Sequence, residues 1–256
     1  TDDGLYISID AGNKWTKWTA GFPTVSVKDL IIHPRENDLV IGTFGRAAWI
    51  LDDIRPLRAL AKNKEILKQK LELFTPPTAY LAAYQQPTGS RFGADDMFNG
   101  ENRSFGAQLS YYVTIDEKKT DDKEKKKDED EDEDEETNEK EDGKVKWDSI
   151  KMMVYDGERL FRTLKEKAPD SSGIHRLTWS LDEAGVDRPS RKTNKRNREP
   201  GGVTVKPGNY KVAISFGDKT SEKMILVKTD PRLDVSLSNI DQVYEASKNL
   251  ETMQQS

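Results

Sequence analysis

The N-terminal part of the chain alternates short apolar runs with turn residues, a pattern typical of β-strands joined by hairpins. Asp, Gly, Asn and Pro fill the gaps between the runs, as expected for turns. Runs rich in β-branched and aromatic residues predict strands over residues 5–9, 25–32, 39–44 and 47–51. This part of the chain is therefore predicted to be all β.

A second β-rich region follows a stretch that is helical in part. Residues 56–73 carry an irregular apolar face, with Pro56 suited to a first helical turn, and the Pro76-Pro77 pair marks a boundary. Beyond it, runs without intervening helices predict a β-sandwich, with strands over residues 105–115, 150–155, 159–164, 174–181, 209–216 and 223–228. Asp156-Gly157 and Gly217-Asp218 are hairpin turns by composition. A C-terminal helix is predicted from residues 243–253.

Charge is concentrated in one segment of the second region. Residues 117–142 hold 16 acids and 7 lysines, a net charge of −9 within a chain whose total is −5. Such a segment buries too little apolar surface to offset its ordering entropy, so we predict a solvated loop between two strands. It lacks the glycine and ligand spacing of a calcium-binding loop. Residues 188–198 form a second, basic loop without the interleaved aromatics of a nucleic-acid site.

Composition excludes several kinds of chemistry. The chain has no cysteine, which removes disulfides, thiolate metal sites and a cysteine nucleophile. Its two histidines, His33 and His175, are too few for a histidine metal site or a catalytic triad, and we interpret them as a turn residue and a strand residue. No apolar run approaches the roughly 20 residues of a membrane span. We therefore expect no cofactor, no metal, no membrane span and no nucleic-acid partner.

One motif near the start is specific. Ser8, Asp10, Gly12 and Trp15 match the Asp-box pattern S-x-D-x-G-x-x-W at every defined position. The carboxylate of Asp10 is placed to accept backbone N–H groups of its own turn, and Gly12 permits a positive φ. Trp15 is expected to fold under the hairpin and bury its indole. Because these groups are satisfied within one hairpin, we interpret the motif as structural.

The motif has a weaker echo further along the chain. Residues 6–10 and 49–53 share the order aromatic, Ile, two residues, Asp, at a spacing of 43 residues. A propeller blade of four strands repeats at about 40–45 residues. The spacing therefore favours a propeller repeat whose second copy is degenerate.

These residues carry a resemblance to a known family. Residues 1–60 resemble the last blade or so of an Asp-box (BNR-repeat) propeller of the sortilin-like type, as found in exported bacterial proteins labelled glycosyl hydrolases; the motif, residues 27–34 and residues 42–53 support it. The following region resembles the immunoglobulin-like domain of flagellar hook-capping proteins, through residues 154–160, 173–179 and 205–210. The resemblance implies an extracellular, periplasmic or cell-surface location.

The predicted organisation follows from pattern and resemblance together. We expect a mainly β chain with terminal propeller blades over residues 1–55, a helical and proline-rich linker over 56–77, and an immunoglobulin-like sandwich over 78–231. The sandwich carries the charged insert at 116–144. Residues 232–256 start a C-terminal helical region. Because the chain begins at Thr1 without Met and its last helix has no cap, we expect both ends to be truncated.

Two functions remain open from the sequence. The first is a binding and structural role, with a protein, peptide or glycan ligand. The second is glycoside hydrolysis with the catalytic carboxylates in upstream blades that this chain lacks. A glycosidase needs two carboxylates about 5–10 Å apart. The candidates here are Asp29, Asp52 and Asp53, and neighbours such as Asp52 and Asp53 would face opposite sides of a strand. We therefore predict no catalytic residue in this chain.

Aromatic residues offer one further hypothesis. Tyr6, Trp15, Trp18 and Trp49 are candidates for a sugar-stacking platform. Aromatic side chains between blades are more often part of the core, and we favour that interpretation.

Overall fold

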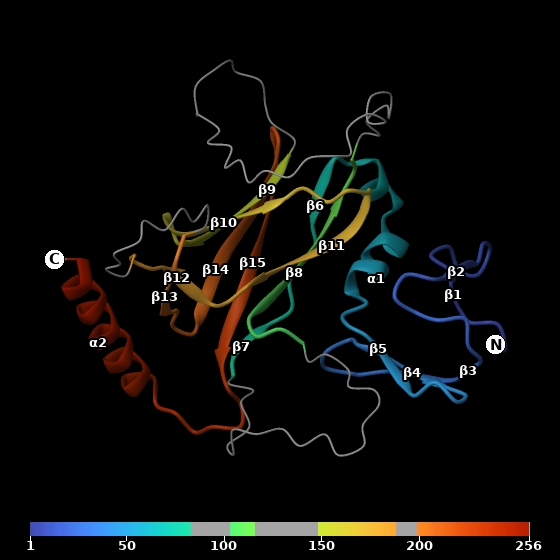
Figure 1. Ribbon diagram of the computed structural model, residues 1–256, viewed down its shortest axis with the longest axis horizontal. Coiled ribbons are helices and arrows are strands. Elements are labelled where there is room, and N and C mark those ends of the chain that lie inside the picture. The colour runs from blue at the N-terminus through green and yellow to red at the C-terminus, as the bar shows by residue number, and fades with distance from the viewer. Residues whose placement is uncertain (83–102, 116–147, 188–198, 256) are drawn as a thin grey trace, which may run out of the picture.

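The computed structural model describes residues 1–82, 103–115, 148–187 and 199–255, and within them the chain is mainly β. The N-terminal part holds an antiparallel hairpin of β1 (Leu5–Ile7) and β2 (Thr16–Trp18). It continues into the N-terminal sheet, an antiparallel arrangement in the order β3 (Val27–Ile32), β4 (Leu39–Thr43) and β5 (Ala48–Leu51). In Figure 1 this part lies at one side of the molecule.

Two sheets form the body of the second region, which we call the β-core. The five-stranded sheet has the order β10 (Arg159–Lys167), β9 (Ser149–Asp156), β14 (Gly208–Phe216), β15 (Lys219–Thr229) and β7 (Ala79–Leu81). The three-stranded sheet has the order β11 (Gly173–Trp179), β8 (Ala107–Val113) and β6 (Leu71–Leu73). A short pair, β12 (Asp182–Ala184) and β13 (Gly201–Thr204), completes it. All pairings are antiparallel except β15 with β7.

One apolar core joins the two larger sheets. It draws alternate side chains from β8 and β6 on one side and from β9, β14 and β15 on the other. Trp179 is fully buried there, and its ring meets that of Tyr210 edge-on at 5.6 Å. The period-2 apolar pattern that predicted these strands therefore marks the face that each strand buries.

Tight turns connect the long strands as their composition predicts. Gly157 between β9 and β10 has φ +59°, and Gly217 between β14 and β15 has φ +58°. Gly106 is more demanding: its φ is +114°, and an added Cβ would lie 2.2 Å from the carbonyl oxygen of Trp179. Only glycine allows the start of β8 to pass so close to the end of β11.

The stretch over residues 56–73, predicted to be helical in part, also contains a strand that the sequence did not predict. It divides into α1 (Arg55–Lys62), a 3₁₀ turn η1 (Lys64–Lys68) and strand β6. Asn63 ends α1 with extended backbone angles, and its side chain accepts the N–H of Glu65 to start the next turn. Leu71 and Leu73 then bury themselves in the core, so the segment predicted as a linker supplies a strand to the β-core.

The strand β3 has little cover on either face. Val27 is buried, but Leu30, Ile31 and Ile32 are 49, 61 and 42% exposed, although their side chains alternate between the two faces. The small cluster beneath the N-terminal sheet contains only Leu5, Phe22, Val27 and Ile41 as buried side chains. The edge strand β3 therefore presents exposed apolar side chains on both of its faces.

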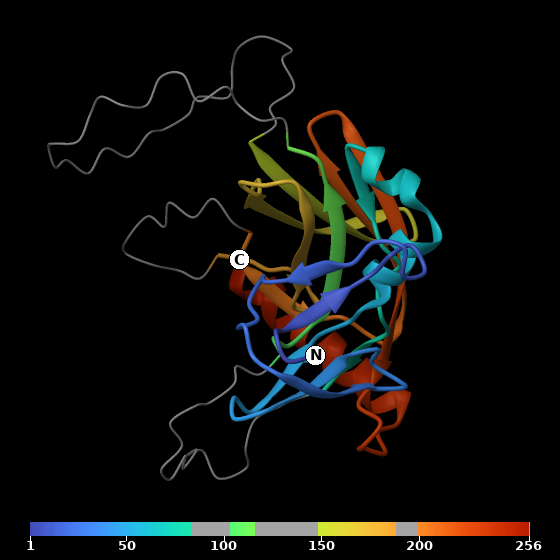
Figure 2. The ribbon, with the colours of Figure 1, turned by 90° about the vertical axis from the view of Figure 1, so that its right-hand side faces the viewer.

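The C-terminal helix is longer than predicted and lies at the side of the β-core opposite the N-terminal sheet (Figure 1). α2 (Leu237–Gln255) has no buried residue. It is held by polar contacts: the buried Glu183 accepts hydrogen bonds from Tyr244 and Lys248, and Lys206 pairs with Asp241 at 3.2 Å. Viewed from the side of the N-terminal sheet, the two larger β-core sheets lie behind it (Figure 2).

Candidate functional site

The Asp-box residues form a closed hydrogen-bonded turn between β1 and β2. The carboxylate Oδ1 of Asp10 accepts the N–H of Lys14 at 2.9 Å and the hydroxyl of Ser8 at 2.8 Å. The same hydroxyl oxygen accepts the N–H of Gly12, whose φ is +87°. These bonds, led by the one from Lys14, lower the pKa of Asp10 below its ordinary value. The carboxylate thus turns into its own hairpin.

The prediction that Trp15 is a core residue is wrong. Its side chain is 62% exposed, and its indole lies over the turn, 3.8 Å from the place that a Cβ on Gly12 would occupy. The space beneath the hairpin belongs to Leu5 and the partly buried Trp18. The indole therefore covers the turn from outside and contributes little buried area.

The other aromatic candidates do not gather into one platform. Trp18 and Trp49 pack against the small core of the N-terminal part, and Trp49 meets Phe22 edge-on at 5.5 Å. The hydroxyl of Tyr6 donates to Asp3 at 3.2 Å. These contacts favour a core role for Trp18 and Trp49 over sugar stacking.

The two histidines lie on different elements and make different contacts. The ring Nδ1 of His33 accepts the N–H of Glu36 in the turn after β3, at 3.1 Å. His175 lies on β11 beside Tyr111 of β8, with ring centroids 5.9 Å apart. Among the described residues there is no group of three or more side chains that could hold a metal ion.

The three acids predicted as candidates lie in different environments. Asp29 lies within β3, next to the register shift after Val27, and its Oδ1 accepts the N–H of Leu30 at 2.8 Å. Asp53 is buried with φ +48° and binds the side chain and backbone of Arg55. Asp52 alone faces a cleft. Asp52 and Asp53 both follow the end of β5 at Leu51 instead of lying within a strand. Their contacts differ: Asp53 binds Arg55, whereas Asp52 binds Arg103 at the cleft.

The cleft at Asp52 is a polar concavity with many charged side chains in its lining. It has a volume of about 740 Å³ and lies between the turns of the N-terminal sheet and the β-core. Its charged lining residues are Arg35, Arg103, Arg232, Glu36, Asp38, Asp52 and Asp230. Most of this set was missed from the sequence, because its members come from segments far apart along the chain.

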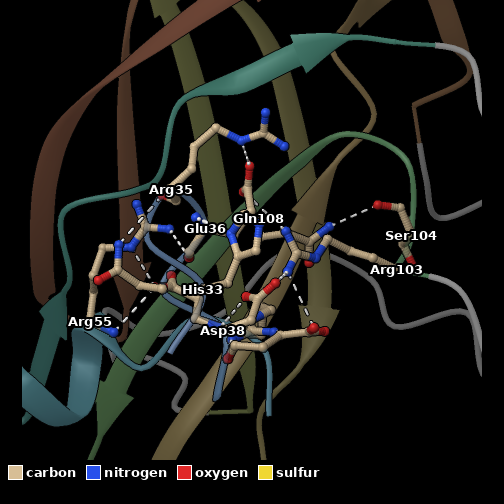
Figure 3. Close-up of polar contacts among 12 residues, drawn as sticks. His33, Arg35, Glu36, Asp38, Arg55, Arg103, Ser104 and Gln108 are labelled. Atoms are coloured by element: carbon tan, nitrogen blue, oxygen red, sulfur yellow. Dashed lines mark hydrogen bonds and ion pairs between the residues drawn. The ribbon is translucent and has the colours of Figure 1, made fainter. Parts of the chain in front are cut away.

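Arg103 is the centre of the cleft wall (Figure 3). Its Nη2 donates to Asp38 at 2.6 Å and to Asp52 at 3.2 Å, and its Nη1 donates to Glu36 at 3.4 Å. Burial disfavours the charged guanidinium, but Asp38 and Asp52 outweigh burial and raise the pKa of Arg103. The arginine precedes β8, whereas its acids belong to the N-terminal sheet, so this cluster joins the two parts.

A second arginine, Arg176, also links the β-core to the N-terminal sheet. Arg176 on β11 donates from Nη2 to the backbone carbonyl of Asp52 at 3.0 Å and from Nε to Ser110 of β8 at 3.2 Å. On the other wall, Arg232 binds both carboxylate oxygens of the buried Asp230 and holds its pKa at about 2. The charged groups are thus fixed by one another before any ligand arrives.

The protein is thus mainly β, and a polar cleft with ion-paired walls lies between its two β-rich parts. Comparisons of the chain with protein-family models, with curated proteins and with solved structures gave no match.

Two further expectations from the sequence concern segments or properties away from this cleft. The charged insert at 116–144 and the basic loop at 188–198 lie, wholly or mostly, outside the described residues. Within the described ranges, neither helix combines the length and the apolar character needed to cross a membrane.

Proposed function

We propose that this chain is part of an exported bacterial propeller protein with a binding and structural role. In this proposal the N-terminal sheet belongs to the terminal Asp-box blades, and the β-core is an immunoglobulin-like sandwich that braces them. The ligand is a protein, a peptide or a glycan.

The observation that carries the proposal is the exposure of apolar side chains on both faces of β3, an edge strand of the N-terminal sheet. Leu30, Ile31 and Ile32 occupy consecutive positions of β3, so their side chains cover both faces. Strands that are apolar on both faces are typical of sheets with other layers on each side. Neighbouring blades would supply such layers, and the closed Asp10 turn supports a scaffold role for the motif.

The bracing role rests on the contacts that Arg103 and Arg176 make with Asp52. Arg103 and Arg176 reach from the β-core to the end of β5, where both bind Asp52. A sheet with a small core of its own gains a fixed orientation from such contacts.

The experiment compares two forms of the protein by hydrogen exchange. In the product isolated from its natural source, residues 28–32 should exchange slowly because neighbouring blades cover them; in the 256-residue chain they should exchange fast. Equally fast exchange in both forms would overturn the proposal. The alternative hydrolase is distinguished by a glycan hydrolysis assay of the natural product, because turnover abolished by one Asp or Glu change in an upstream blade would establish catalysis.

A further inference from the structure

We propose that the cleft around Arg103 binds a neutral oligosaccharide. This inference rests on the proposed binding role and names the ligand class. It is carried by the balance of charge, the arrangement of donors and acceptors, and the apolar side chains at the same site.

The charges that line the cleft nearly cancel. Three arginines stand against four carboxylates, a net charge of −1. An anionic ligand therefore meets no net positive field, and a cation meets carboxylates that already accept hydrogen bonds from arginine. The lining favours an uncharged ligand.

The exposed groups include both donors and acceptors. The side chains of Arg35 and Arg232 are 67 and 61% exposed, and that of Asp52 is 36% exposed. A hydroxyl group donates one hydrogen bond and accepts others, so neighbouring sugar hydroxyls match such a mixed surface. Since the ion pairs hold these groups in place, little ordering is required when a ligand binds.

Apolar surface lies next to the charged groups. Ile50 of β5 is 63% exposed at the cleft, and Tyr80 of β7 and Pro77 line it as well. A pyranose ring has an apolar C–H face and a rim of hydroxyls, which corresponds to this combination. The volume of about 740 Å³ lies within the usual range of small-molecule sites, about 300–1,000 Å³.

The test uses the intact 256-residue chain and titration calorimetry. The probes are cellotetraose, xylotetraose, mannotetraose and maltotetraose, with trigalacturonic acid and an uncharged hexapeptide as the other ligand classes. We expect at least one neutral tetrasaccharide to bind with a dissociation constant of about 1 mM or tighter. Amide shifts on binding should include Arg103 and Gly106.

Variants locate the site. Arg35→Gln and Ile50→Ser change exposed side chains, so the unfolding midpoint should stay unchanged while affinity falls about tenfold. Arg58→Gln is the matched control, because Arg58 is an exposed arginine of α1 that binds Asn37 and does not line the cleft. Its affinity should stay within about twofold of the wild type.

Several results would overturn the inference. These are no binding of any neutral tetrasaccharide at about 10 mM, preference for trigalacturonate or the peptide, or an equal loss of affinity in Arg58→Gln. None of them contradicts the proposed scaffold role, which is tested separately by hydrogen exchange in β3.

Discussion

Arg103 and Asp38 are 65 residues apart in the sequence, and the guanidinium Nη2 of one donates to the carboxylate Oδ2 of the other at 2.6 Å. This bond links the segment before β8 to the turn that precedes β4. The same nitrogen also reaches Asp52 after β5. A single side chain therefore fixes two turns of the N-terminal sheet against the β-core.

Removing the guanidinium of Arg103 should weaken the contact between the N-terminal sheet and the β-core. We expect Arg103→Gln to lower the free energy of unfolding by about 1–3 kcal/mol, because partly buried carboxylates lose a charged donor. Urea denaturation of Arg103→Gln, Asp38→Asn and the double variant measures the coupling, expected to be above about 0.5 kcal/mol. Arg58→Gln should stay within about 0.5 kcal/mol of the wild type. Additive single changes would show that the bond does not join the two parts.

Two tryptophans should respond oppositely to truncation. Trp15→Ala should cost less than about 1 kcal/mol, because the indole is 62% exposed. Trp179→Ala should cost about 3–5 kcal/mol, because this side chain is fully buried in the β-core. Thermal or urea unfolding measures both. A large cost at Trp15 would place the indole in a core that the structure does not show.

The hydrogen bonds of the Asp-box turn should be detectable as a lowered pKa when Asp10 is titrated. The pKa of Asp10 lies below its ordinary value of 3.8 because Lys14 N–H and the Ser8 hydroxyl donate to the charged form. A folded-state pKa below the unfolded one means that the carboxylate stabilises the fold above the unfolded pKa, and that this stability is lost as pH falls through the folded pKa.

The carboxyl ¹³C shift of Asp10 measures this effect. Ser8→Ala should raise the pKa of Asp10 toward 3.8, whereas Ser26→Ala should leave it unchanged, because the Ser26 hydroxyl donates to Asp2 instead. An unchanged pKa in Ser8→Ala would contradict the closed turn.

The attachment of α2 should depend on Glu183. Burial, and after it the hydrogen bond and charge of Glu183, raise the pKa of Tyr244. Glu183→Gln should lower the pKa of Tyr244 while burial still keeps it above its ordinary value, and amide exchange in α2 should become faster. Glu251→Gln is the control, because Glu251 accepts a hydrogen bond from Lys248 within α2, whereas the hydroxyl of Tyr244 donates to Glu183. This variant should change the pKa of Tyr244 less than Glu183→Gln does. An unaltered pKa of Tyr244 in Glu183→Gln would show that the helix is held by other groups.

Much of the strand content could be predicted because burial imposes a local pattern. The runs at 209–216 and 150–155 became β14 and β9, whose alternate residues enter the core. The strands β12 and β13 were missed, because Asp-Glu-Ala consists of residues depleted in strands and β13 begins with two glycines, so that the two segments pair only through tertiary context. The strand β6 was missed because its three residues follow a helical segment directly.

The cleft could not be predicted from the sequence for a different reason. Arg176 and Asp52 are separated by 124 residues, and no local spacing signals such a contact. The prediction that Trp15 is buried was wrong because a motif defines residue types but does not determine on which side of the hairpin the indole packs. Asp10 differed, since its partners lie within four residues along the chain.

The uncovered strand β3 also governs how the purified chain behaves in solution. An edge strand with Leu30, Ile31 and Ile32 exposed is a template for intermolecular β-pairing. Solubility should therefore fall at high protein concentration and in high salt, where the surrounding charges are screened. A lysine in place of Ile31 would act as a gatekeeper against precipitation without disturbing the buried face at Val27.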